Sequence, residues 1–296
     1  MMRLSARGAR DLRDGLLFLL PSAFLFAVFV FYPLARTFYL SLFITSPTGR
    51  LVTFAGLDQY LELLTSKTFQ SSLLATSLFV LYAVPVGIAI ALVLATLANR
   101  RLRGINVFRT LMTSTIALSA AVGSLIWLML LNPNLGLLNY LLSLAGIRGP
   151  NWLQEQGTAV LAVSMTTIWL TLGFSIIVLL AGLQGVPEEL YEAAKIDGAS
   201  PFAMFRRITV PLLSPQLFFL LVVHTIGVFQ VFTQIHLLTR GGPVDATRTL
   251  VYGIYLDAFQ DFKFGYASTQ AVVLLAILLT LTLVQFFLIE RRVHYQ

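Results

Sequence analysis

Long apolar runs alternate with short polar segments along almost the whole chain. A helix needs about 20 consecutive apolar residues to cross the roughly 30 Å hydrocarbon core of a bilayer. Runs of this kind lie near residues 15–34, 73–97, 111–131, 159–183, 212–238 and 271–289. The pattern therefore predicts an all-α polytopic membrane protein, with one six-span transmembrane domain over residues 15–290.

The composition supports the same class of protein. Of the 296 residues, 57% are hydrophobic and 11% are charged, and the mean hydropathy of +0.84 lies outside the range of soluble domains. The chain contains no cysteine, which excludes a disulfide framework, a thiol nucleophile and a cysteine-ligated metal site.

The basic residues indicate which way the chain crosses the membrane. Most of the 20 Lys and Arg residues fall in alternate loops and at the two ends of the chain. These are Arg3, Arg7, Arg10, Arg13, Arg100, Arg101, Arg103, Arg109, Lys195, Arg206, Arg207, Arg291 and Arg292. By the positive-inside rule, residues 1–14, residues 291–296 and the loop between the fourth and fifth spans are predicted to be cytoplasmic. This distribution explains the net charge of +7 without a nucleic-acid partner.

Two loops on the opposite side are expected to carry structure. Leu57, Tyr60, Leu61 and Leu64 recur at helical spacing, which predicts a short helix at the membrane interface. A further helical segment is expected around residues 250–259, after a Gly-Gly-Pro turn that ends the fifth span.

The positions of the acidic residues indicate how active transport by this chain would be powered. All 13 Asp and Glu residues lie in loops or at termini, whereas ion-coupled carriers usually place a carboxylate within the membrane. No G-x-x-x-x-G-K-[ST] loop is present to bind ATP phosphates. Energy for active transport is therefore expected to arrive through a partner. An ion-coupled secondary transporter and an integral-membrane enzyme remain the alternatives.

The enzyme alternative has little support from the spans. His224 and His236 have no acidic companion in any span to complete a catalytic triad. His224 also lacks partners at metal-ligand spacing, so no metal site is predicted.

Polar side chains within the fourth and fifth spans are candidates for contact with a hydrophilic solute. Such groups are costly in hydrocarbon unless they face a cavity or another helix. They are Ser164, Thr166, Thr167, Thr171 and Ser175 in the fourth span, and His224, Thr225, Gln230, Thr233, Gln234 and His236 in the fifth. The competing interpretation is that each bonds to its own helix or joins two helices.

The polar segment 188–211 lies between these two spans. Its halves, EAAKID and PFAMFRRI, are expected to form short helices broken at Gly198, where a residue without Cβ can adopt the angles of a sharp turn. A polar helix pair in a loop of a membrane protein indicates a docking surface.

This segment resembles the EAA loop of the permease subunits of binding-protein-dependent ABC importers. The matching positions are Glu192, Ala193, Ala194, Gly198, Ile208 and Pro211, with Val210 where leucine is commoner. Similarity extends through YPLARTFYLSL, FAGLDQY, LNPNLGLLN and LLTRGGPVDATRTL. Together these stretches resemble the carbohydrate-uptake class, both maltose-permease-like and glycerol-phosphate-permease-like, here with six spans.

The resemblance implies a type I ABC importer permease fold in which the EAA loop, residues 188–211, forms cytoplasmic coupling helices. These helices would insert into a groove of the ATPase subunit. The residues implied in coupling are Glu192, Ala193, Ala194, Asp197, Gly198, Ala199, Phe202, Phe205, Arg206 and Pro211. Glu192 would pair with a basic group of the ATPase, and the two phenylalanines would fill apolar pockets.

The resemblance also implies a solute path on the spans that flank the EAA loop. The matching positions are Thr167, Leu170, Thr171 and Phe174 on the fourth span, and His224, Gly227, Val228 and Val231 on the fifth. Gln230 and Gln234 lie close by and add amide groups.

The implied function is that of a non-catalytic permease subunit in the inner membrane of a prokaryote, with both termini cytoplasmic. It would form half of the path for a sugar or an sn-glycerol-3-phosphate-like solute. The implied partners are a homologous second permease, an ATP-binding cassette ATPase dimer, an extracytoplasmic solute-binding protein and the lipid bilayer. No cofactor is expected in this chain, because ATP and Mg would bind the ATPase subunits.

Overall fold

The computed structural model describes residues 6–100 and 102–290. The predicted cytoplasmic C-terminus, residues 291–296, lies outside the described residues, as do residues 1–5 of the predicted N-terminal segment. Arg3, Arg101, Arg291 and Arg292 of the charge pattern belong to these parts. The chain divides into two compact units, one formed by Met1–Leu63 and Ile254–Val273, the other by Leu64–Gly253 and Leu274–Gln296.

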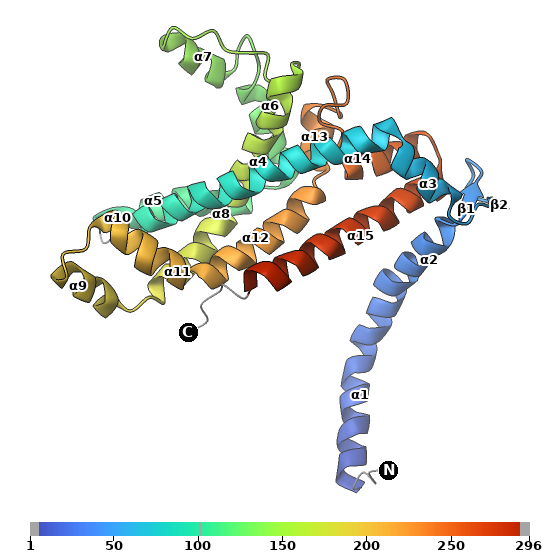
Figure 1. Ribbon diagram of the computed structural model, residues 1–296, viewed down its shortest axis with the longest axis horizontal. Coiled ribbons are helices and arrows are strands. Elements are labelled where there is room, and N and C mark those ends of the chain that lie inside the picture. The colour runs from blue at the N-terminus through green and yellow to red at the C-terminus, as the bar shows by residue number, and fades with distance from the viewer. Residues whose placement is uncertain (1–5, 101, 291–296) are drawn as a thin grey trace. The chain divides into compact units, whose positions relative to one another are not determined.

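Long apolar helices form the larger unit (Figure 1). Its helices are α4 (Lys67–Ala98), α5 (Ile105–Thr113), η2 (Ser114–Ala117), α6 (Ala120–Leu130), α7 (Leu137–Leu144), α8 (Gln156–Gln184), α9 (Glu188–Ile196), α10 (Pro201–Met204), η3 (Phe205–Thr209), α11 (Val210–Leu212), α12 (Ser214–Phe229), α13 (Thr233–Leu238), the start of α14 (Leu250–Tyr255) and the end of α15 (Phe264–Ile289). Four described helical segments of the chain are long and apolar enough to span a membrane, and six if each bent helix pair counts as one span.

The core of this unit lies where α4, α8 and α12 meet. Ala91 and Ala95 of α4 are fully buried, together with Leu179 of α8 and Leu220 of α12. Small side chains on α4 allow its backbone to approach α8 closely, which is how helices commonly associate in lipid. The side chain of Ser66 accepts a hydrogen bond from the amide of Phe69 and caps the start of α4.

The third predicted span, 111–131, is not one straight helix. The helical segments Ile105–Ala117 and Ala120–Leu130 are bent by 109° at the break between them. Ser119 caps the second segment by accepting from the amide of Val122 at 3.3 Å. The apolar run that predicted this span has no proline or glycine at the break, so the sequence carried no signal for the bend.

The fifth predicted span, 212–238, is also interrupted. Pro201–Leu212 and Ser214–Phe229 meet at 66°, and the second of these helices ends before the short α13 begins at Thr233. Gln230 caps the C-terminus of α12 through its backbone amide. The polar residues of α13 therefore do not continue a face of α12, because the helix is interrupted between Phe229 and Thr233.

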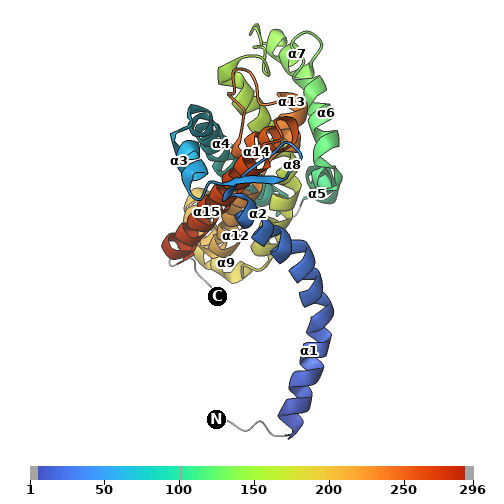
Figure 2. The same ribbon diagram turned by 90° about the vertical axis from the view of Figure 1, so that its right-hand side faces the viewer.

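The smaller unit joins helices to a short antiparallel ribbon. Its elements are α1 (Ala6–Phe26), η1 (Ala27–Phe31), α2 (Tyr32–Leu40), β1 (Phe43–Thr45), β2 (Leu51–Phe54), α3 (Asp58–Thr65), the end of α14 (Leu250–Tyr255), η4 (Leu256–Gln260) and the start of α15 (Phe264–Ile289). Phe43 pairs with Phe54 across the ribbon, which Figure 2 shows in blue. The amide of Gly265 donates to the Thr45 hydroxyl at 3.0 Å, and this contact attaches the ribbon to α15.

The predicted helix in the first outer loop is present as α3, and its two buried positions lie apart from the exposed leucines. Leu63 and Gln59 are buried, whereas Leu57, Leu61 and Leu64 are exposed. The Gln59 amide donates to the Ser41 carbonyl at 3.2 Å, which explains why a polar residue occupies the buried side. The second predicted outer helix, residues 250–259, forms as α14 and η4.

Candidate functional site

Two short helices joined by a tight turn form the segment 188–211, which we call the coupling segment (Figure 1). The first helix, α9, has Glu188 and Glu189 in its first turn and Lys195 in its last. This order of charges is favourable, because acidic groups stabilise the positive end of the helix dipole and basic groups the negative end.

Gly198 sets the turn between the two helices. Its φ of +77° is a left-handed conformation that residues with a side chain adopt at a cost. The amide of Ala199 donates to the Ala194 carbonyl at 2.9 Å, and the amide of Gly198 donates to the Lys195 carbonyl at 3.0 Å. These two bonds close the end of α9 in the manner of a glycine C-cap. The sequence prediction of a sharp turn here matches the backbone that the structure describes.

The second half of the coupling segment starts with a side-chain cap. The Ser200 hydroxyl accepts from the amide of Ala203 at 3.2 Å, and Pro201 occupies the first helical position. The hydroxyls of Tyr191 and Thr209 lie 3.0 Å apart and tie α9 to the far end of the second helix. The angle between the helices is therefore fixed by the turn and by this cross-link together.

Apolar side chains on this hairpin are turned away from the rest of the protein. Phe202 is 71% exposed and Ile196 is 87% exposed. Glu192, Asp197 and Arg206 are exposed as well, whereas Phe205 is half-buried. Phe202 was predicted from the sequence as a contact residue and Ile196 was not, although its position at the end of α9, directly before the turn, was a signal for it. Exposed apolar groups surrounded by charge are typical of a protein interface.

Most hydroxyl groups predicted for the solute path bond to their own helix. Thr167 donates to the Val163 carbonyl at 3.0 Å, and Thr171 donates to the Thr167 carbonyl at 3.0 Å. Thr166 does the same with the Ala162 carbonyl at 3.0 Å. For these residues the competing interpretation describes the structure, although each hydroxyl oxygen keeps acceptor capacity.

One polar contact joins the two flanking helices. The Ser175 hydroxyl of α8 lies 2.7 Å from Nε2 of His224 of α12, and both residues are buried. The ring of Phe174 meets the His224 ring edge to face, with centroids 6.3 Å apart. The structure thus brings together His224 and Phe174 from the predicted path. Ser175 was among the polar candidates of the fourth span but not among the positions that the resemblance implies for the solute path.

The other predicted path residues have different surroundings. Leu170 packs against α6, since a Cβ added at Gly123 would lie 2.4 Å from Leu170 Cδ2. Val228, Val231 and Gln234 are buried, whereas Gly227 and Gln230 are exposed. Gln230 is the first residue of the break between α12 and α13, and Gln234 lies in α13.

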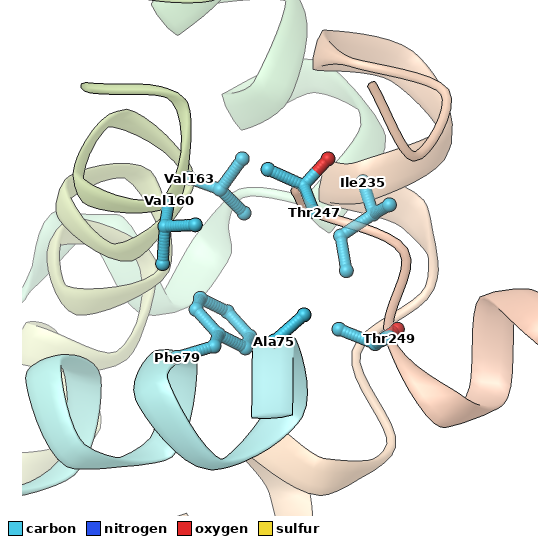
Figure 3. Close-up of a pocket in the computed structure, with 7 residues that line it drawn as sticks. All are labelled: Ala75, Phe79, Val160, Val163, Ile235, Thr247 and Thr249. Carbon is cyan, nitrogen blue, oxygen red and sulfur yellow. The ribbon is translucent and has the colours of Figure 1, made fainter. Parts of the chain in front are cut away.

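Beyond this break, the protein is tightly packed. The rings of Phe232 and His236 stack with centroids 5.2 Å apart, and Tyr252 lies against both. A nearby hollow has a volume of about 10 Å³, room for no more than about one water molecule. Figure 3 shows the residues that line it, Ala75, Phe79, Val160, Val163, Ile235, Thr247 and Thr249. This hollow is too small to hold a sugar.

Within residues 6–100 and 102–290, no group of three His, Asp or Glu side chains is placed to hold a metal ion.

Residues 83–295 match the family model of the binding-protein-dependent transport system inner membrane component. The chain belongs to this family, so it is a multi-pass membrane permease component of an ABC importer and is not itself an enzyme. The coupling segment lies within the matched region.

Relatives in the same family resemble the chain over nearly its full length. It is 38% identical over 278 residues to the sn-glycerol-3-phosphate transport system permease protein UgpA of Agrobacterium fabrum, covering 93% of this chain and 94% of the relative. It is 35% identical over 283 residues to UgpA of Yersinia enterocolitica, covering 95% of both chains. The fold matches a chain of the crystal structure of a bacterial alginate ABC transporter in complex with an alginate pentasaccharide-bound periplasmic protein. That match has a TM-score of 0.80 at 24% identity, and it covers 94% of this chain and 95% of the other.

Replacing Ser175 with alanine is expected to lower the stability of the purified chain by about 1–3 kcal/mol, because the buried His224 ring would lose its partner. The measurement is thermal unfolding in detergent. Thr166→Val is the matched control, since that buried hydroxyl bonds only within α8 in the structure. Equal stability of both variants and the unchanged chain would show that the Ser175–His224 contact does not hold the helices together.

Proposed function

We propose that this chain is one of two homologous permease subunits of an importer driven by an ATP-binding cassette ATPase dimer. The coupling segment faces the cytoplasm with both chain termini, and it receives the motion of the ATPase when ATP binds with Mg. An extracytoplasmic binding protein delivers the solute to the opposite side. The two permeases then open alternately to each side of the membrane.

The exposure of apolar side chains on the coupling segment is the observation that carries this proposal. Phe202 and Ile196 are too exposed to contribute to the protein's own packing, and burying them against a partner groove would recover their hydrophobic stabilisation. Glu192 and Asp197 supply charge at the rim of the same surface. A rigid turn at Gly198 lets a push on one helix move the other as a unit.

Glu192→Lys tests the coupling role directly. In proteoliposomes that contain the complete transporter and its binding protein, this variant is expected to lower ATP-driven uptake at least about tenfold, because a like charge would face the basic group of the ATPase. Glu189→Lys, a charge reversal in the first turn of the same helix, is the control and is expected to have a smaller effect. Normal uptake by Glu192→Lys would contradict the proposal. Uptake by the purified chain without any ATPase would instead support an ion-coupled carrier.

For the solute, we propose sn-glycerol 3-phosphate or a closely similar phosphorylated polyol. The support is the identity of 38% and 35% with permeases of that name over at least 93% of this chain. Similarity over this length includes both flanking spans and the outer segments that meet a binding protein.

A neutral sugar is the second candidate, because neither α8 nor α12 contains Lys or Arg to neutralise a phosphate. The two are distinguished by measuring ligand binding to the cognate binding protein and uptake by the complete transporter. Saturable uptake of labelled sn-glycerol 3-phosphate, unaffected by excess glycerol or maltose, is expected. Competition by a neutral sugar alone would favour the second candidate.

A further inference from the structure

A hollow with two arginines lies in the turn that follows α4. Its volume is about 320 Å³, which falls at the lower end of the range of small-molecule sites, about 300–1,000 Å³. Its lining consists of Leu97, Arg100, Leu102, Arg103, Gly104, Ile105 and Phe108. No residue of the coupling segment or of the solute path takes part, so the proposed function leaves this hollow unexplained.

The backbone around the hollow is held by local hydrogen bonds. Nε of Arg109 in the middle of α5 donates to the Ala98 carbonyl at 2.8 Å and thereby ties α5 to the end of α4. The amide of Ile105 donates to the Leu102 carbonyl at 3.3 Å. Gly104 has a φ of +81°, and a Cβ added there would meet nothing within 4 Å, so the space beside it is open. The site is therefore shaped before any ligand arrives.

Positive charge in the hollow is not neutralised by an ion pair with any residue that the structure describes. Arg100 and Arg103 are exposed, and neither forms an ion pair with a described residue. The sequence contains no Asp or Glu anywhere from Lys67 to Gln154. An anionic ligand would gain charge-assisted hydrogen bonds from guanidinium groups, which suit the oxygens of a phosphate.

The apolar part of the lining indicates what kind of anion fits. Leu97, Leu102 and Phe108 border the same space and are each exposed by 41–60%. The hollow lies at the end of one membrane-spanning helix, α4, and at the start of the next helical segment, Ile105–Ala117. This is the depth at which lipid headgroups meet acyl chains.

We propose that the hollow binds an anionic phospholipid, with Arg100 and Arg103 on the headgroup phosphate and the apolar side chains against the first part of an acyl chain. Basic pockets next to transmembrane helices bind acidic headgroups by the same combination of charge and apolar contact. The bound lipid would fill the gap between the end of α4 and the start of α5.

Native mass spectrometry of the full-length chain in detergent tests this proposal. Phosphatidylglycerol is added alone, with an excess of phosphatidylcholine, or with inorganic phosphate. We expect phosphatidylglycerol to bind in preference to phosphatidylcholine. R100Q/R103Q is expected to weaken phosphatidylglycerol binding about 30-fold, and each single variant about fivefold.

R50Q/R148Q is the matched control, because it removes the same charge at exposed positions outside the hollow. Equal losses in the two double variants would show that binding follows net charge, and unchanged binding in R100Q/R103Q would place the lipid elsewhere. Displacement of the lipid by inorganic phosphate would identify a free-phosphate site. Each of these results would overturn the proposal. Because the assay contains no ATPase or transported solute, its outcome is independent of the proposed function.

Discussion

Replacing Gly198 with proline is expected to abolish ATP-driven uptake while leaving the subunit in the membrane. Proline holds φ near −65°, whereas Gly198 has φ of +77° and donates its amide to Lys195 at 3.0 Å. Proline can neither adopt a positive φ nor donate an amide hydrogen. A cost of about 3 kcal/mol for this misfit corresponds to a loss of roughly 100-fold in the population of the correct turn. Phe202 and Glu192 would then no longer be presented together. ATP hydrolysis by the partner is expected to continue without transport.

Gly146 provides a close match as a control. It has φ of +75°, follows a short helix and donates its amide to the Ser143 carbonyl at 3.0 Å, as Gly198 does to Lys195. Neither glycine has atoms within 4 Å of an added Cβ. Gly146→Pro is therefore expected to disturb a turn to the same degree but to retain most uptake. Uptake should be measured together with ATP hydrolysis in the same proteoliposomes. Similar losses in both variants would indicate general misfolding, and normal uptake by Gly198→Pro would rule out a role for the turn.

Replacing Gly173 with alanine is expected to destabilise the larger unit, although alanine usually favours a helix. A Cβ at this position would lie 2.6 Å from the Thr115 hydroxyl, 2.7 Å from the Thr113 carbonyl oxygen and 3.0 Å from the Ile116 amide nitrogen. Two of these atoms belong to backbone and cannot rotate away. The change would also strain the 3.0 Å hydrogen bond from the Gly173 amide to the Thr115 hydroxyl. Overpacking of this kind costs about 1–3 kcal/mol.

The measurement is the thermal unfolding of purified chain in detergent, and a decrease of several degrees in Tm is expected. Gly157, near the start of the same helix, is the control because a Cβ there would meet nothing within 4 Å. Gly157→Ala is expected to leave Tm unchanged or to raise it slightly. If Gly173→Ala proved as stable as Gly157→Ala, the close approach of the bend to α8 would not be a constraint in solution.

The local features of the coupling segment could be predicted from the sequence because they depend on neighbours along the chain. Gly198 is needed for a left-handed turn, and Ser200 followed by Pro201 is a frequent start of a helix. Glu192 was recognised from the spacing of the EAA loop and is exposed in the structure.

The hydrogen bonds of the residues predicted for the solute path could be predicted only in part. Thr167 and Thr171 are polar residues in an apolar span, which is visible in the sequence, but their hydroxyls bond within α8. The contact of Ser175 with His224 joins residues 49 positions apart, and sequence spacing gives no information on how two helices are rotated against each other.

The sequence by itself determined the class of protein, its build from long apolar helices and the turn at Gly198 in the coupling segment. These follow from the thickness of the bilayer, the periodicity of a helix and the backbone freedom of glycine, all of which act over short stretches. Only the tertiary structure decided where spans bend. The 109° bend before α6 is supported by Thr115, which meets Gly173 from a distant part of the chain. The tertiary structure also placed Arg100 and Arg103 around one hollow, because that arrangement depends on how α5 packs against the end of α4.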